Sequence, residues 1–298
     1  MKILLFGMNG QVGWELQRSL APLGELVALD FDSPGPLAAD FTQPETLAAT
    51  VRAVAPQIIV NAAAHTAVDK AEAEPELART INARAPEVLA REAQALGAWL
   101  VHYSTDYVFD GSGTAPWSED APTGPLSVYA HTKLEGEQAI RASGCHHLIL
   151  RTSWVYAARG GNFARTMLRL AAERDRLEVI DDQIGAPTGA ELLADVTAHA
   201  LRGVLAQPGL GGTYHAVAGG HTSWHGYASH VIEFARAAGQ PMRVKAQDIA
   251  AVPSSAFPTP AQRPRNSRLD TRKLQQAFGL NLPDWRTGVD RMLREVLG

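Results

Sequence analysis

Short runs of consecutive apolar residues alternate with longer amphipathic stretches through the first half of the chain. The amphipathic stretches predict helices at about 11–22, 44–55, 75–97 and 127–143. Regular alternation of strands and helices is typical of a parallel sheet covered by helices on both faces. The sequence therefore predicts an α/β fold with a doubly wound parallel sheet of the Rossmann type. The predicted strands are Ile3–Phe6, Leu26–Asp30, Ile58–Asn61, Trp99–Ser104 and Leu148–Thr152.

Beyond about residue 155 the alternation becomes less regular. Helices are predicted at 161–175, 188–206, 224–239 and 285–297, and the Pro- and Ser-rich stretch Val252–Pro264 predicts a loop. We expect a dinucleotide-binding domain over residues 1–155 and a smaller, mainly substrate-binding domain over 156–298. Some segments of the second part are expected to return to the first domain. Trp224 and Trp285 lie on amphipathic helices and are expected in the core.

Composition and charge narrow the classes of partner. A net charge of -4 argues against nucleic acid, because phosphate binding normally leaves a basic surface. No apolar run approaches the roughly 18 residues of a membrane span, and Ile3–Phe6 is shorter than the about 7–15 apolar residues of a secretory signal. The single Cys145 cannot form an intrachain disulfide, which fits a reducing compartment. We expect a cytoplasmic protein with no nucleic-acid or membrane partner.

Three glycines, Gly7, Gly10 and Gly13, follow the first predicted strand and open the first predicted helix. They allow a tight turn, close approach of the backbone to a pyrophosphate and close packing of helix on strand. The helix N-terminus then offers free N–H groups to the phosphates. This context indicates a dinucleotide site, although three glycines could also form a simple turn.

Asp30 ends the second predicted strand, 23 residues after Gly7. A carboxylate at this place usually binds the adenosine ribose hydroxyls and repels a 2′-phosphate. No Arg or Lys occurs between Asp30 and Arg52, so NADH is favoured over NADPH. A solvated aspartate at a strand end is the alternative interpretation.

Tyr129 and Lys133 lie four residues apart in a predicted helix, so their side chains share one face. A free phenol has a pKa near 10, too high for efficient proton transfer at neutral pH. A nearby ammonium and an oxidised nicotinamide are expected to lower the pKa of Tyr129. Thr105, which ends the predicted strand before this helix, would add a third polar contact to a substrate oxygen. The pattern indicates a nicotinamide-dependent oxidoreductase.

Taken together, these motifs resemble the extended short-chain dehydrogenase/reductase superfamily. Longer blocks are similar to the dTDP-4-dehydrorhamnose reductase family within it, and the resemblance spans nearly the whole chain. The blocks are Gly10–Gly13, Asn61–Asp69, Ser104–Phe109, Arg151–Tyr156, Gly185–Thr188 and Arg263–Ser267.

The resemblance implies hydride transfer from NADH or NADPH to the C4 keto group of dTDP-4-dehydro-L-rhamnose, the last step in making dTDP-L-rhamnose for surface polysaccharides. It assigns Tyr129 as the proton donor, Lys133 as its activator and Thr105 as the third catalytic member, and it places Thr105, Asp106 and Trp154 at the substrate. It also implies a homodimer and a magnesium ion, for which we expect Glu15, Glu191 and Glu295. The expected cofactor residues are Gly7, Gly10, Gln11, Val12, Gly13, Asp30, Asp40, Phe41, Ala62, Ala63, Ala64, Tyr103, Tyr129 and Lys133.

Two alternatives remain open from the sequence. One is a nucleotide-sugar epimerase or dehydratase on the same fold. Dehydratases of this group carry Thr-Asp-Glu after the fourth strand, whereas Tyr107 follows Thr105 and Asp106 here. The other is a non-catalytic nucleotide-binding subunit, since fold does not imply turnover. The intact Thr105, Tyr129 and Lys133 favour an enzyme.

Overall fold

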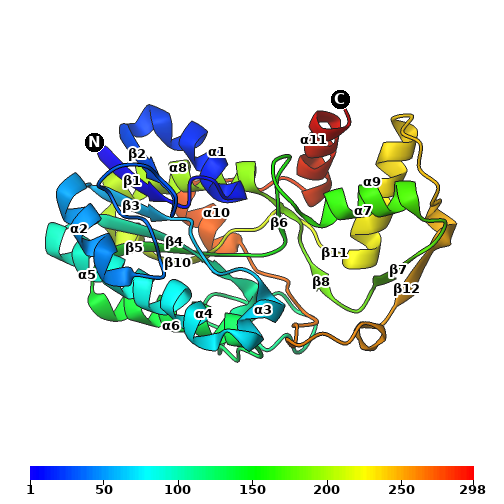
Figure 1. The fold of residues 1–298 in the computed structure, drawn as a ribbon, viewed down its shortest axis with the longest axis horizontal. Coiled ribbons are helices and arrows are strands. Elements are labelled where there is room, and N and C mark those ends of the chain that lie inside the picture. The colour runs from blue at the N-terminus through cyan, green and yellow to red at the C-terminus, as the bar shows by residue number, and fades with distance from the viewer.

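The computed structural model describes residues 1–298 and contains a six-stranded parallel sheet (Figure 1). The strand order is β10-β5-β4-β3-β1-β2, and every neighbouring pair is parallel. The predicted α/β doubly wound fold is therefore confirmed. The strands are β1 (Lys2–Phe6), β2 (Glu25–Leu29), β3 (Ile58–Asn61), β4 (Trp99–Thr105), β5 (His146–Thr152) and β10 (Gly212–His215).

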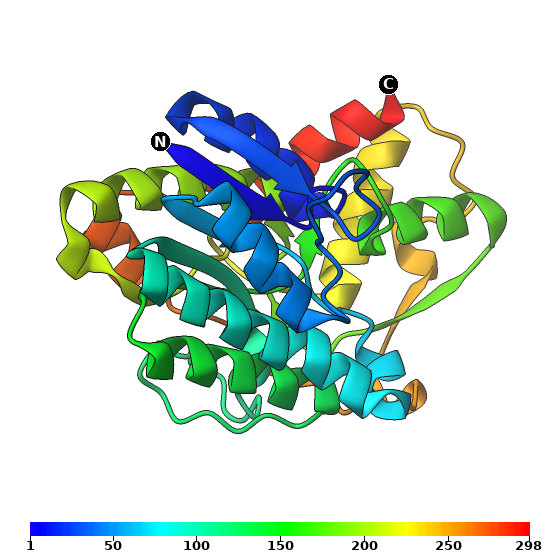
Figure 2. The same cartoon turned by 60° about the vertical axis from the view of Figure 1, so that its left-hand side comes forward.

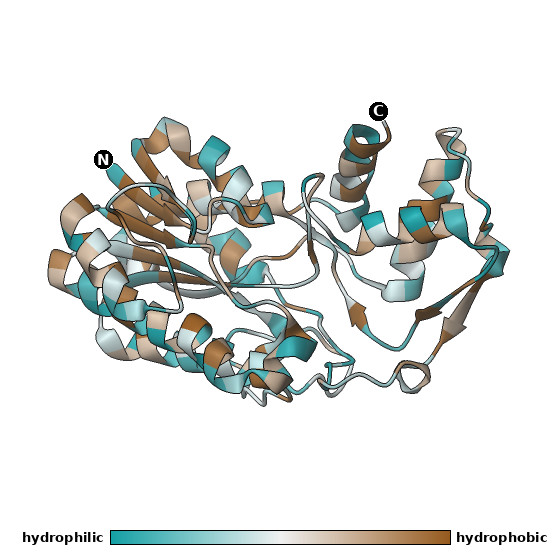
Figure 3. Cartoon of the chain, viewed as in Figure 1, coloured by the Kyte–Doolittle hydropathy of each residue, from teal (hydrophilic) through white to brown (hydrophobic).

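Both faces of this sheet are buried, which explains the unbroken apolar runs. Alternate residues of one strand enter different cores: Ile3 and Leu5 pack on one face, Leu4 and Phe6 on the other. Figure 2 shows helices lying across the sheet, and Figure 3 shows its apolar strands between more polar helices. One face is covered by α1 (Gln11–Leu20), α8 (Ala190–Ala206) and α10 (Arg272–Phe278), and the other by α2 (Pro44–Val54), α5 (Ala85–Leu96) and α6 (Val128–Ser143).

A second body of the molecule, separate from the sheet in Figure 1, has its own apolar core. Trp285 is fully buried there, as predicted. The chain crosses between the two bodies more than once: α8 and β10 belong to the sheet, although they follow segments of the second body. The second body contains α7 (Phe163–Glu173), α9 (Trp224–Ala237), α11 (Trp285–Leu297) and the paired strands β7 (Leu177–Ile180) and β12 (Ile249–Val252).

The helix predicted over residues 75–97 is interrupted. It begins as α4 (Pro75–Arg79), widens into a π-helical turn at Thr80–Arg84, and continues as α5. Pro86 explains the interruption, because it has no N–H to bond the carbonyl of Asn82, and its ring would collide with that carbonyl in a regular helix.

The boundaries of the other predicted elements differ from prediction by only a few residues. Several short elements were not predicted. These unpredicted elements include α3 (Val68–Ala73), β7, β10, β12 and α10. No helix has the length and apolar character needed to cross a lipid bilayer.

Candidate active site

The glycine loop joins β1 to α1, and two of its glycines cannot be replaced without steric conflict. Gly7 has a φ of +84°, and a Cβ there would lie 2.7 Å from the backbone nitrogen of Ala63. A Cβ on Gly13 would lie 1.9 Å from the carbonyl oxygen of Gly7. The loop is thus closely packed against the end of β3, and it leaves the N-terminus of α1 open at the sheet edge. This cradle fits a dinucleotide pyrophosphate.

A pocket of about 460 Å³ opens beside this loop at the carboxyl ends of β1, β3, β4 and β5. It brings together the predicted catalytic set Thr105, Tyr129 and Lys133 with the predicted substrate residues Asp106 and Trp154. Of the predicted cofactor residues, it also contains Gly10, Gln11, Val12, Ala62, Ala64 and Tyr103. The sequence predicted no binding or catalytic role for the remaining lining residues, which are Thr66, Val68, Ser104, Tyr107, Thr152, Ser153, Val155 and Trp224.

Tyr129 stands in the first turn of α6, where the backbone is fixed by a helix cap. The hydroxyl of Ser127 accepts a hydrogen bond from the backbone N–H of Ala130. Burial raises the pKa of Tyr129 to about 12, although a hydrogen bond with Thr105 opposes this shift. The phenol therefore carries its proton at neutral pH, which suits a proton donor. In the protein without cofactor, desolvation of the phenolate outweighs the contact with Thr105, and the lowering of this pKa by an ammonium together with an oxidised nicotinamide stays a prediction.

Lys133 lies one turn further along α6 and is buried. Its Nζ donates to the carbonyl oxygen of Tyr103 at 2.6 Å and lies 3.2 Å from Nε2 of His102. Burial lowers the pKa of Lys133 to about 8, against the attraction of Glu137. Contacts with His102 and Tyr103 of β4 thus fix the Lys133 side chain in the pocket lining.

Below Lys133, α6 is anchored to β5 by a buried ion pair. The guanidinium of Arg151 donates to both carboxylate oxygens of Glu137, at 2.9 and 2.7 Å. Neither side chain is more than 4% exposed. Burial by itself raises the pKa of Glu137, but the hydrogen bonds and charge of Arg151, together with hydrogen bonds from Ser104 and Arg141, lower it below its ordinary value. Glu137 is therefore ionised at neutral pH and fixes the helix that carries Tyr129 and Lys133.

Asp106 offers a free acceptor in the pocket. One of its oxygens accepts from the Thr105 hydroxyl at 3.2 Å, while the other is buried without a partner. Burial raises the pKa of Asp106 to about 7, and the nearby hydroxyls of Ser267 and Thr105 oppose this shift. A buried polar atom without a partner is costly, so Asp106 fits a site for a substrate hydroxyl.

Trp154 forms the pocket wall on the side of the second body. Its indole stacks on Trp224, with ring centroids 3.6 Å apart and an interplanar angle of 14°. Trp224 was predicted in the core; it packs against the core of the second body, but this half-buried ring also lines the pocket behind Trp154. Trp154 has a φ of +48°, a conformation that is strained for a bulky residue and often marks functional sites.

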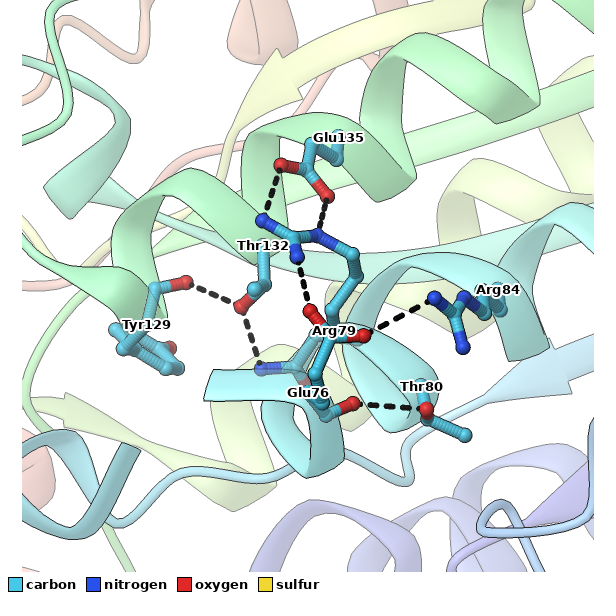
Figure 4. Close-up of polar contacts among 8 residues, drawn as sticks. Glu76, Arg79, Thr80, Arg84, Tyr129, Thr132 and Glu135 are labelled. Atoms are coloured by element: carbon cyan, nitrogen blue, oxygen red, sulfur yellow. Dashed lines mark hydrogen bonds and ion pairs between the residues drawn. The ribbon is translucent and has the colours of Figure 1, made fainter. Parts of the chain in front are cut away.

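The π-helical turn does not line the pocket, but its hydrogen bonds fix residues next to the pocket. Asn82, within this turn, accepts from the N–H of His65 at 2.9 Å and donates to the hydroxyl of Thr132 at 3.2 Å. Thr132 in turn donates to the carbonyl oxygen of Tyr129 (Figure 4). Figure 4 also shows Arg79 joining α4 to Glu135 of α6. The sequence pattern did not reveal a role for Asn82; the signal it offered was Pro86, four residues later.

The other predicted cofactor residues lie outside the pocket lining. Oxygens of Asp30 accept from the backbone N–H groups of Asn9 and Phe31, at 2.9 and 2.8 Å, so Asp30 ties the glycine loop to the end of β2. Asp40 bonds Thr42 and Gln43. Ala63 donates its N–H to Asn61. Phe41 is buried against Phe6, with ring centroids 5.5 Å apart.

The three glutamates proposed for magnesium line a different pocket, of about 230 Å³, beside α1, α8 and α11. Glu191 pairs with Arg291 at 3.1 Å, and Glu15 pairs with Arg18 at 3.5 Å. No group of three His, Cys, Asp or Glu residues has an arrangement that could hold a metal ion. A magnesium site at Glu15, Glu191 and Glu295 is therefore not supported, because arginines already neutralise two of the carboxylates.

Comparison with known proteins gives matches along the whole chain. The family described as RmlD substrate binding domain matches residues 1–297. A dTDP-4-dehydrorhamnose reductase from Escherichia coli (strain K12) is 60% identical over 296 residues, covering 99% of this chain and 98% of that protein.

Two solved structures of dTDP-4-dehydrorhamnose reductases are also similar. The protein from Clostridium acetobutylicum has a TM-score of 0.90 and 34% identity, covering all of both chains. The one from Bacillus anthracis, in complex with NADP, has a TM-score of 0.87 and 34% identity, covering 99% of each chain. From the shared fold, the meeting of Thr105, Tyr129 and Lys133 in one pocket and these matches, we conclude that the chain belongs to the RmlD substrate-binding-domain family, together with the dTDP-4-dehydrorhamnose reductases.

Proposed function

We propose that this chain reduces the C4 keto group of dTDP-4-dehydro-L-rhamnose with NADH or NADPH, giving dTDP-L-rhamnose. The observation that carries the proposal is the meeting of Thr105, Tyr129 and Lys133 in one pocket beside the glycine loop. The 60% identity to the Escherichia coli reductase supports the choice of substrate.

The geometry supports a simple division of roles. The Thr105 hydroxyl turns its single proton from Asp106 to the substrate, so that the keto oxygen accepts hydrogen bonds from Thr105 and Tyr129. When bound, the reduced nicotinamide supplies the hydride to C4. Tyr129 gives its phenolic proton to the oxygen, which completes the alcohol. An ammonium on Lys133 then stabilises the phenolate until a proton from solvent restores the phenol. We assign the cradle at Gly7, Gly10 and Gly13 to the pyrophosphate of the cofactor.

The test is a direct assay of the wild-type protein. It should consume NADH or NADPH in the presence of dTDP-4-dehydro-L-rhamnose and form dTDP-L-rhamnose, as followed by cofactor absorbance and product analysis. A panel of other nucleotide 4-keto sugars measures specificity. Failure to consume either cofactor with any member of the panel would contradict the proposal.

The glutamate that a dehydratase would use as its acid/base residue is absent from this chain. Tyr107 occupies that place and packs edge-on against Tyr129, with ring centroids 5.8 Å apart. Burial raises the pKa of Tyr107 above its ordinary value, so this side chain does not replace a carboxylate. An epimerase would retain its cofactor through the cycle, and tightly bound nucleotide in the purified protein would favour that alternative.

We predict that Trp154→Ala raises the KM for the sugar nucleotide about five-fold, because an aromatic contact contributes on the order of 1 kcal/mol. The apolar face and methyl group of a deoxysugar fit the indole, which is half-buried. Steady-state kinetics, cofactor affinity and thermal unfolding should be measured on the same variant. If the melting temperature collapses while the folded fraction keeps wild-type kinetics, Trp154 closes the junction between the two bodies and does not bind substrate.

Asp30→Ala is expected to weaken NADH binding about ten-fold or more, and NADPH binding less. Loss of hydrogen bonds to a charged group costs about 1.5–3 kcal/mol, while the substitution also removes repulsion from a 2′-phosphate. Because Asp30 also anchors Asn9, Asp30→Asn is the matched control: it removes the charge and keeps an acceptor for the loop. Equal losses for the two cofactors in both variants would make Asp30 structural only.

We also propose a division of binding roles between the two parts of the chain, an oligomeric state and a cellular location. We assign cofactor binding mainly to residues 1–155 and sugar binding mainly to 156–298. We expect a homodimer, which sedimentation can test. We place the reaction in the cytoplasm, consistent with a buried free thiol at Cys145.

A further inference from the structure

Gln183 is a buried polar residue that does not line the pocket but contacts an aromatic residue that does. It directly precedes β8 (Ile184–Gly185) and is 6% exposed. β8 pairs antiparallel with β11 (Thr222–Ser223), and Trp224 follows β11, so the pairing brings Trp224 beside Gln183 (Figure 1). The indole N–H of Trp224 donates to Oε1 of Gln183 at 3.1 Å. Two short paired strands thus place this amide at the pocket wall.

The partners of Gln183 fix which end of its amide faces the indole. The N–H of Trp224 can only donate, so it requires the amide oxygen. On the other side, the amide NH₂ donates to the hydroxyl of Ser254 at 3.0 Å. That hydroxyl accepts because its own proton is given to Asp182, whose carboxylate also accepts from the backbone N–H of Ser254 at 2.8 Å. A turned amide would place donor against donor and acceptor against acceptor, so the chain of bonds has one arrangement.

The bond to Gln183 gives Trp224 an orientation that stacking alone does not give. Trp224 lies on the indole of Trp154, with ring centroids 3.6 Å apart and an interplanar angle of 14°. A stacked aromatic contact depends weakly on how one ring is turned in its own plane. A hydrogen bond at Nε1 fixes that turn, because it ties one edge of the indole to a buried, fully bonded amide.

The place of Trp154 depends in turn on Trp224. Trp154 also contacts Gly185 of β8, where a Cβ would lie 2.8 Å from Cε2 of the indole. The indole therefore has no space to move toward β8. The backbone of Trp154 has a φ of +48°, and such a conformation persists only where the surrounding packing maintains it. A shift of Trp224 is thus the change that would displace Trp154.

We propose that Gln183 is a positioning residue for sugar binding: it fixes Trp224 through the indole N–H, and through the stack it sets the position of Trp154 in the pocket. The proposal rests on the proposed function, in which Trp154 contacts the deoxysugar. It links the affinity for the sugar nucleotide to a residue outside the pocket. Through Ser254, it also links the pocket wall to the stretch Val252–Pro264.

The competing interpretation is that Gln183 only stabilises the second body. Trp154 and Trp224 both pack against the core of that body, so a stabilising role is physically reasonable. In that case the loss of the amide would lower the melting temperature, while the folded protein would keep its KM and the position of Trp154. The two interpretations therefore differ in what the folded variant does.

The kinetic test uses Gln183→Met, which removes both hydrogen bonds and keeps a long side chain. We expect the KM for dTDP-4-dehydro-L-rhamnose to rise about two- to five-fold, with kcat and cofactor affinity close to wild type. In the Trp154→Ala background the same substitution should add nothing, because it acts through Trp154. Gln240→Met is the matched control: its amide also belongs to the second body but bonds the carbonyl oxygen of Leu297, and its KM should not change.

Nuclear magnetic resonance of the ligand-free protein gives a readout that needs no turnover. The six tryptophans give indole N–H signals that Trp154→Ala and Trp224→Phe assign. Gln183→Met should speed solvent exchange of the Trp224 indole hydrogen and shift the Trp154 signal, because the stacked ring moves. Gln183→Glu keeps an acceptor for the indole and should restore both signals and the KM.

Ser254→Ala gives a second route should Gln183→Met fail to fold. It removes the hydroxyl that holds the amide, and we expect smaller changes of the same two indole signals. Unchanged Trp154 signals in both Gln183→Met and Ser254→Ala would overturn the proposal. So would a KM rise that persists in full in the Trp154→Ala background, or an equal rise in Gln240→Met. The indole signals are measured without substrate, so they separate failure of this proposal from failure of the reductase assay.

Discussion

Tyr129→Phe is expected to lower kcat by about 10²–10⁴-fold, because it removes the general acid while keeping the aromatic ring. The phenol lines the pocket and contacts the hydroxyl of Thr105. Folding should survive, since Tyr129 is held by its backbone and by Thr132. Cofactor affinity should change little.

The measurement combines steady-state kinetics with thermal unfolding and cofactor titration. Tyr214→Phe is a matched control: it also removes one phenolic oxygen, but that hydroxyl bonds the carbonyl oxygen of Leu210 outside the pocket. Turnover of Tyr129→Phe within a factor of three of wild type would remove Tyr129 from the mechanism.

Arg151→Leu is expected to destabilise the fold by about 3–5 kcal/mol, because it leaves Glu137 buried without its ionic partner. The pKa of Glu137 is lowered in the folded protein, so the contribution of the pair is present at neutral pH. It is lost as the pH falls through the lowered pKa of Glu137. Equilibrium denaturation at neutral pH measures the loss.

Two comparisons sharpen this test. The double variant Glu137→Gln, Arg151→Met removes both charges and should recover much of the stability, because the desolvated carboxylate is gone. Arg18→Leu breaks an exposed pair with Asp195 and should cost no more than about 1 kcal/mol. A loss for Arg151→Leu as small as that for Arg18→Leu would show that the buried pair does not anchor α6.

Together the two predictions describe one helix face. Tyr129, Lys133 and Glu137 are spaced by four residues, so they form a row along α6 from the pocket to the interior. Tyr129 donates the proton, Lys133 interacts with the negative charge of the resulting phenolate, and Glu137 fixes the helix against β5. A substitution at the pocket end of this row should therefore lower activity, whereas one at the buried end should lower the stability of the fold.

The sequence alone determined the features that depend on local pattern. Strands buried on both faces require continuous apolar runs, so β1 and β3 could be located to within a residue. Gly7 and Gly13 were recognisable because the turn and the helix–strand contact admit no side chain. Tyr129 and Lys133 were paired correctly by helical spacing.

Only the tertiary structure decided what surrounds these residues. β10 could not be assigned because four residues carry little pattern, and its place depends on pairing with β5. Trp224 appeared to be a core residue until its stack with Trp154 placed it in the pocket. The surroundings of Lys133, whose Nζ lies 3.2 Å from Nε2 of His102, could not be predicted, because hydrogen bonds and desolvation depend on distance in space and not on distance along the chain.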